Sequence, residues 1–123
     1  MTTSIDEQGV REVIALYAEG MRTGDVEMLK RGFHKQAILC GYLGDDLIAG
    51  PITELYDWVA ANAAPAATGE PYSCETLGIE TTGRVATARV RESDHHGVVI
   101  DHFHLLKVGE RWSIVSKLWD AEP

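Results

Sequence analysis

Four strand-like segments fill the C-terminal part of the chain, and only short turns separate them. The turns read "TTGR", "DHHG" and "VGER", and each contains the glycine that tight turns favour. Strands joined by such short turns pair antiparallel with their chain neighbours, so this part predicts a meander. One face of an antiparallel sheet has to be buried, and the rest of the chain must cover it. The predicted strands are Tyr72–Thr81, Val85–Asp94, Val98–Val108 and Arg111–Asp120.

Helical patterns in the first half of the chain provide that cover. "SIDE" fits a capping box, and it begins a helix that ends near Gly24. Asp25 caps a second, shorter helix that continues through Phe33. A third helix begins at Pro51 or Thr53, in "ITELYDWVAAN". The apolar positions of the first helix recur at helical spacing, at Val10, Val13, Ile14, Tyr17 and Met21.

The remaining segments complete the expected architecture. Two short strands, "AILCGYLG" and "DLIAG", lie between the second and third helices, and "AAPAATGEP" predicts a loop after the third. The order of elements predicts an α+β domain in which three helices pack on one side of a curved antiparallel sheet. A length of 123 residues, with 45% hydrophobic and 24% charged residues, is typical of one globular domain. We therefore expect a single domain over residues 1–123.

Charge and composition exclude several classes of partner. The net charge is −8 and no run of Lys or Arg occurs, so we expect neither nucleic acid nor anionic membrane as a partner. "MTTSIDEQGV" lacks the basic start and apolar core of a signal peptide, which predicts a cytoplasmic protein. Cys40 and Cys74 have no CxxC spacing, and we expect two reduced, mostly buried thiols.

Side-chain alternation assigns the polar residues of "IDHFHLL" to two faces of the sheet. If "DHHG" is a four-residue hairpin loop, Val90 lies opposite Asp101 and Arg89 lies opposite His102. The first face is apolar apart from Asp101, so we expect Asp101 to point toward the helices. The second face is polar and points outward. The inward set is then Ala86, Ala88, Val90, Asp101, Phe103 and Leu105, and the outward set is Thr87, Arg89, His102 and His104.

The last strand carries apolar residues on both faces. We expect Val115, Lys117 and Trp119 to share the face of Asp101, with Trp112 on the other face. Two partly apolar faces indicate that both are covered. Helices on the concave face and a second copy of the chain on the convex face satisfy this condition, so we expect a homodimer.

Two stretches resemble a known superfamily over nearly the whole chain. "YAEGMRTGDVEMLKRGFHKQAIL" resembles the first two helices and the following strand of the nuclear-transport-factor-2-like (NTF2-like) superfamily. This superfamily has a cone-shaped, cystatin-like α+β fold, and it includes ketosteroid isomerases, limonene epoxide hydrolase and SnoaL-like polyketide cyclases. "HFHLLKVGERWSIVSKLWD" resembles the putative lumazine-binding branch, whose members mostly have no assigned activity.

The likeness to ketosteroid isomerases identifies individual positions. Tyr17, before "GD", matches their oxyanion Tyr, and Asp101, in "IDHF", matches their oxyanion Asp. Their general-base Asp falls on Gly41 here, which argues against a steroid-type proton shuttle. Lys117 beside Asp101 favours ionised forms and would remove the neutral acid that an isomerase needs. The pair is then either a polar anchor for a ligand or purely structural.

These observations predict a mostly apolar cavity between the sheet and the first and third helices, which binds a small organic molecule. Tyr17 and Asp101 would hydrogen-bond the ligand, and Lys117 would hold Asp101 or an acidic group. An enzyme of isomerase, cyclase or dehydratase type, with Asp101 or His34 as acid or base, stays open as an alternative. A carrier, sensor or non-catalytic dimerisation module also stays open. The remaining predicted ligand-binding residues are Trp119, Phe103, Trp58 and Val115.

We expect no metal and no other cofactor. Four histidines occur close together, and His102 with His104 could form a ligand pair on a strand. Zinc and iron sites normally need a third protein ligand, and Asp101 points to the opposite face. His95 and His96 are expected to be solvated in a turn.

Overall fold

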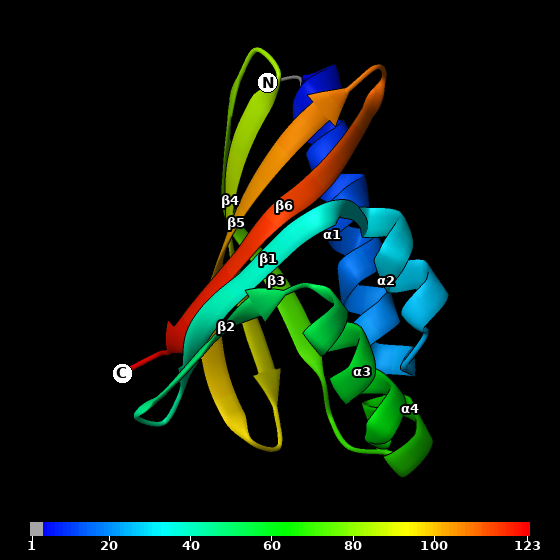
Figure 1. Ribbon diagram of the computed structural model, residues 1–123, viewed down its shortest axis with the longest axis vertical. Coiled ribbons are helices and arrows are strands. Elements are labelled where there is room, and N and C mark those ends of the chain that lie inside the picture. Colours follow the sequence, from blue (N-terminus) through cyan, green and yellow to red (C-terminus); the bar gives the residue numbers. More distant parts are fainter. Residues whose placement is uncertain (1–3) are drawn as a thin grey trace.

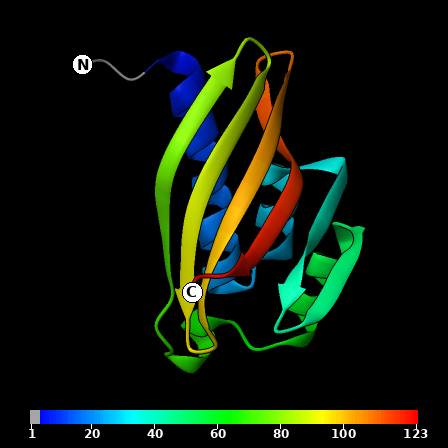
Figure 2. The same cartoon turned by 90° about the vertical axis from the view of Figure 1, so that its left-hand side faces the viewer.

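The computed structural model describes residues 4–123, so residues 1–3 of the expected domain lie outside the described part (Figure 1). A six-stranded sheet in the order β2-β1-β6-β5-β4-β3 packs its concave face on the helices (Figures 1 and 2). This confirms the predicted α+β fold with a curved sheet. The elements are α1 Ile5–Thr23, α2 Val26–Gly32, β1 Phe33–Leu43, β2 Asp46–Pro51, α3 Thr53–Ala61, α4 Pro65–Thr68, β3 Ser73–Thr82, β4 Val85–Asp94, β5 Gly97–Val108 and β6 Arg111–Ala121.

Helix α1 begins and ends as its sequence predicts. The Ser4 side chain accepts a hydrogen bond from the Glu7 amide at 3.0 Å. Gly24 ends the helix in the left-handed region, with φ of 73°, and its amide donates to the carbonyl of Gly20. The buried side of α1 faces the sheet and consists of Val10, Val13, Ile14, Tyr17 and Gly20. In the described part of the chain, no helix is both long and apolar enough to cross a membrane.

Several strands begin or end one or more residues away from the predicted bounds, and the larger differences concern the helices. Helix α2 ends at Gly32, and Phe33 is already the first residue of β1. The stretch predicted as a loop after α3 contains the short helix α4, which Pro65 begins and Gly69 ends. Pro65 suits the first position of a helix because its missing amide has no partner there in any case.

The pairing of β4 with β5 confirms the predicted faces. Val90 pairs with Asp101 and Ala88 with Phe103, and all four are buried. On the outer face, Arg89 pairs with His102. The pairs β3–β4, β4–β5 and β5–β6 form the expected antiparallel meander, and β6 then pairs in parallel with β1.

A β-bulge in β6 overturns one prediction about its faces. His104 pairs with Ser116 and Leu105 pairs with Ile114, which leaves Val115 as the extra residue. The alternation of inward and outward side chains therefore shifts at Val115. As a result, β6 has buried, inward-facing residues on both sides of the bulge. Trp112 is only 5% exposed and its Nε1 donates to Asp6 of α1 at 3.3 Å. The expectation that Trp112 lies on the outer face is wrong.

Candidate functional site

Asp101 lies in the middle of β5 and points inward, as its pairing with Val90 predicts. Its exposed fraction is 0%. Lys117 of β6 is also buried, and its Nζ donates to Oδ1 of Asp101 at 2.6 Å. The structure thus brings together two residues that the sequence placed on one face.

Glu92 is a third charged member of this group, and it is absent from the residues predicted from the sequence. It lies on β4, two residues beyond Val90, so the same alternation turns it inward. Its Oε2 accepts a hydrogen bond from the Tyr17 hydroxyl and its Oε1 accepts one from the Tyr72 hydroxyl, each at 2.7 Å. Nζ of Lys117 lies 3.9 Å from Oε2. We call Tyr17, Tyr72, Glu92, Asp101 and Lys117 the buried polar cluster.

The charges of this cluster differ from the sequence expectation because one ammonium faces two carboxyl groups. Burial raises the pKa of Asp101 to about 8, against the lowering effect of Lys117, and Glu92 adds to the rise. Burial also opposes ionisation of Glu92, but the hydrogen bond with Asp101, the charge of Lys117 and the tyrosine hydroxyls together hold its pKa below the usual value. We therefore assign the carboxylate to Glu92 and the proton to Asp101 at neutral pH.

The hydrogen bonds agree with that assignment. Oδ2 of Asp101 is buried and no donor contacts it, which fits a protonated carboxyl group better than a carboxylate. Burial raises the pKa of Tyr17 and of Tyr72, so both phenols remain donors. Glu92, rather than Asp101, is the hydrogen-bond partner of Tyr17. Burial likewise raises the pKa of the free thiol of Cys74 to about 12, which disfavours a reactive thiolate.

Trp119 seals one side of the cluster, and Gly41 makes room for it. Gly41 of β1 pairs with Trp119 of β6. A Cβ at position 41 would lie 2.2 Å from Cδ2 of the Trp119 ring, which is impossible without movement. The ring centroid lies 4.4 Å from Nζ of Lys117, within range of a cation–π interaction. The aromatic ring thus occupies the space of the side chain that the isomerase general base would need.

A pocket of about 270 Å³ reaches the cluster from solvent. It lies between the end of α1, α3, the segment that contains α4, and the β4–β5 hairpin. Glu92 and Tyr72 line it, so the cluster contributes two of its hydrogen-bonding groups to the pocket wall. Trp58, predicted to bind the ligand, lines it too, and 51% of its surface is exposed. The other lining residues are Met21, Gly24, Val59, Asn62, Ala63, Ala64, Pro65, Thr68, Glu70, Asp94, His95 and His96.

Of the predicted site residues, Trp58 lines this pocket, whereas Tyr17, Asp101, Lys117, Trp119, Phe103, Val115 and His34 do not. Phe103 is fully buried in the core and packs edge-on against Tyr17, with the ring centroids 5.0 Å apart. Val115 is the half-buried bulge residue of β6. His34 lies at the start of β1, where its Nδ1 accepts a hydrogen bond from the Gln36 amide at 3.0 Å. The functional roles predicted for these residues stay predictions.

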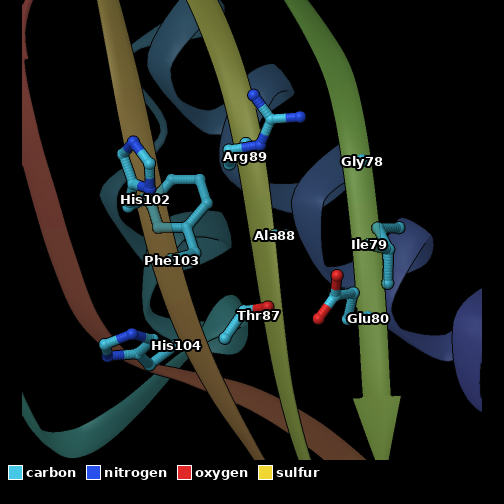
Figure 3. Close-up of a pocket in the computed structure, with 9 residues that line it drawn as sticks. All are labelled: Gly78, Ile79, Glu80, Thr87, Ala88, Arg89, His102, Phe103 and His104. Atoms are coloured by element: carbon cyan, nitrogen blue, oxygen red, sulfur yellow. The ribbon is translucent and has the colours of Figure 1, made fainter.

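The outer face of the sheet carries a different hollow, of about 390 Å³ (Figure 3). Strands β3, β4 and β5 line it with Arg89, His102 and His104 among others, and the two histidines are exposed. Nδ1 of His104 and Oγ of Ser116 are hydrogen-bonded at 2.9 Å. This hollow is larger than the inner pocket, but no member of the buried polar cluster lines it.

Comparison with known proteins places these features in a family context. The family described as putative lumazine-binding matches residues 5–120. An aldolase, FrzH, from a Cladobotryum species is 23% identical over 98% of this chain and 95% of its own length.

Solved structures are similar over the full length. An NTF2-like protein of unknown function from Methylobacillus flagellatus is 32% identical, with a TM-score of 0.87 over 99% of this chain and 97% of that one. One from Shewanella baltica is 31% identical, with a TM-score of 0.85 over 100% and 99%. A protein from Nostoc punctiforme with a cystatin-like fold, 17% identical with a TM-score of 0.75 over 98% and 94%, shows the fold alone.

Proposed function

The chain belongs to the putative lumazine-binding family of the NTF2-like superfamily, as its motifs predicted, and from this premise we propose that it binds a small organic molecule in the inner pocket. The observation that carries the proposal is that Glu92 belongs both to the buried polar cluster and to the pocket wall. Its carboxylate accepts hydrogen bonds from within the buried polar cluster and also lines the pocket. A ligand in the pocket would therefore meet a fixed acceptor.

Glu92 and Tyr72 define the class of ligand. The Tyr72 hydroxyl holds the Glu92 carboxylate in place, and a carboxylate accepts from N–H or O–H groups of a ligand. Ring amides and hydroxyl groups supply such donors, and the ring N–H groups of a lumazine are of this kind. A volume of about 270 Å³ is just below the ~300–1,000 Å³ of drug-sized ligand sites, which favours a small molecule.

The residues predicted from the sequence take supporting roles in this proposal. Asp101 and Lys117 set the charge behind Glu92, and Tyr17 orients it through the hydrogen bond to Oε2. Trp58 lies at the pocket wall with half of its surface exposed, where a planar ligand can stack on it. Trp119 excludes water from the cluster on the side of Gly41.

Acid–base catalysis is the second candidate function. Asp101 holds a proton beside a carboxylate, and this pairing supplies the neutral acid needed for isomerase, cyclase, dehydratase or aldol-type steps. The relative named as an aldolase supports this candidate. Asp101 reaches the pocket only through Glu92, so binding without chemistry remains our first proposal. A catalytic role of His34 has no support from its position.

A fluorescence titration with lumazine tests the binding proposal. We expect saturable binding to the wild-type chain. The affinity of Glu92→Gln and of Tyr72→Phe should be reduced by about tenfold or more, since each variant loses a fixed hydrogen-bonding group. His102→Gln, on the outer face, is the matched control and should bind as the wild type does. Equal binding by all four proteins would contradict the assignment of the ligand to the inner pocket.

We also propose that residues 1–123 form one domain that assembles as a homodimer through the outer face. Partly exposed apolar side chains on this face support the second copy, because the pairing of the strands places them on the same side as His102 and His104. They are Ile38, Val85, Leu106 and Leu118. The free thiols of Cys40 and Cys74 fit a reducing compartment and support a cytoplasmic location.

A further inference from the structure

The β4–β5 hairpin gathers three groups that can ligate a metal. Asp94 ends β4, and His95 and His96 form the turn that follows. One potential ligand atom from each of the three lies within 4.8 Å of the others. The two imidazole rings lie against each other, with centroids 3.8 Å apart. The third ligand that was missing for His102 and His104 is therefore present for this second histidine pair.

Glu70 brings a fourth group from a separate segment. It lies between α4 and β3, at the same end of the molecule as the β4–β5 hairpin (Figures 1 and 2). Its Oε2 contacts Nδ1 of His95. This oxygen is buried and has no other polar partner, so a carboxylate oxygen is held directly against the imidazole of His95.

In the described part of the chain, neither carboxylate has a Lys or Arg partner. Glu70 and Asp94 have ion-pair contacts only with His95 and His96 in the described part of the chain. No Lys or Arg is among the residues that line the inner pocket. In contrast, Glu75 and Glu122 on the outside of the sheet both pair with Arg91. A divalent cation would supply the positive charge that the protein provides elsewhere with Arg91.

We propose that Glu70, Asp94, His95 and His96 bind a divalent transition-metal ion of the zinc class at the wall of the inner pocket. Imidazole nitrogen with carboxylate oxygen suits zinc and its neighbours, whereas magnesium and calcium prefer oxygen ligands alone. Ligand atoms lie ~2.0–2.2 Å from zinc, so any two are at most about 4.4 Å apart. The observed 4.8 Å limit needs a small rotation of exposed side chains to close around an ion.

The position of this site links it to ligand binding without making it depend on that function. All four residues line the same pocket as Glu92 and Tyr72. An ion there faces the pocket contents, where it can attract an anionic or carbonyl oxygen of a small molecule. The proposal concerns the ion alone and holds whether or not lumazine binds.

Calorimetric titration of the untagged, metal-free full chain with zinc chloride tests the proposal, and cobalt(II) absorption reports the coordination. We expect about one ion per chain, bound roughly tenfold or more weakly by His95→Asn and by Glu70→Gln. His102→Asn, which removes an exposed histidine from the outer face, should bind as the wild type does. Circular dichroism checks that each variant is folded, and Glu70→Gln preserves the hairpin if His95→Asn disturbs it.

The opposite results would overturn the site. Absence of zinc binding to the wild-type chain would do so, and so would unchanged zinc affinity in both His95→Asn and Glu70→Gln. Weakening in His102→Asn that equals the weakening in His95→Asn would show nonspecific histidine binding. Since the readout is the metal ion itself, failure here leaves the lumazine titration unaffected, and the reverse also holds.

Discussion

The two faces of β5 carry similar residue types with different physical roles. Asp101 faces inward and has no exposed surface, and its protonation is coupled to the charges of Glu92 and Lys117. His102 and His104, its neighbours on either side of Phe103, face outward and are exposed. Burial strengthens each interaction on the inner face, while water screens the outer one. The sheet face on which a polar residue of β5 lies therefore decides whether its protonation is coupled to neighbouring charges.

The first way to break this comparison is to remove the ammonium group of the buried polar cluster. Lys117→Met leaves two carboxyl groups buried without a cation, so we expect the free energy of unfolding to fall by about 3–5 kcal/mol. Urea denaturation measures the change. His102→Gln on the outer face is the control and should stay within about 0.5 kcal/mol of wild type. A loss of similar size in both variants would mean that the faces do not differ in this way.

The second test uses the pH dependence of stability. The folded-state pKa of Asp101 is raised to about 8 from a normal value near 3.8, so its contribution is complete below about pH 4 and is lost as the pH rises through about 8. The stability of wild type relative to Asp101→Asn should therefore decrease across this window, by on the order of 5 kcal/mol. Denaturation curves at several pH values measure it. A relative stability that rises with pH would indicate an ionised Asp101 instead.

The third test concerns the seal of the inner face. Gly41→Ala places a methyl group in the Trp119 ring, and we expect a loss of about 1–3 kcal/mol together with a change in tryptophan fluorescence. Gly78→Ala is the matched strand control, since its nearest contact would be an ordinary 3.6 Å to Arg89. If both glycines tolerate alanine equally, Trp119 does not close the cluster.

The smallest effect on stability is expected on the outer face. Leu118→Glu adds a charge to a partly exposed position, so the fold should lose no more than about 0.5 kcal/mol. The same change should convert the proposed dimer into monomers, which light scattering detects. Ile5→Glu, at the exposed start of α1, is the control for added charge. Unchanged mass of a Leu118→Glu dimer would place the interface elsewhere.

Much of the fold follows from local patterns in the sequence. The capping box at Ser4, the glycine turns and the apolar alternation predict most elements, and the short "DHHG" turn sets the register of Val90 against Asp101. The faces of β6 could not be predicted in full, because the bulge at Val115 depends on packing between strands. Helix α4 has four residues, too few to show a helical period.

The candidate site was predictable only in part, for a physical reason. Asp101, Lys117 and Tyr17 were accessible through alternation and resemblance, and alternation beyond Val90 also points Glu92 inward. Tyr72 lies just before β3, and its contact with Glu92 depends on tertiary packing. The role of Gly41 likewise emerges only from the parallel pairing of β1 with β6, which brings it against Trp119.

The protonation state of Asp101 is the most direct test of the difference between the two faces. Carbon-13 NMR of the Asp101 side-chain carboxyl, followed over pH in the wild-type chain, measures it residue by residue. We predict a midpoint near 8, with the proton retained at neutral pH. A midpoint at or below about 4, the ordinary value for Asp, would contradict a buried neutral acid and would restore a simple ion pair with Lys117.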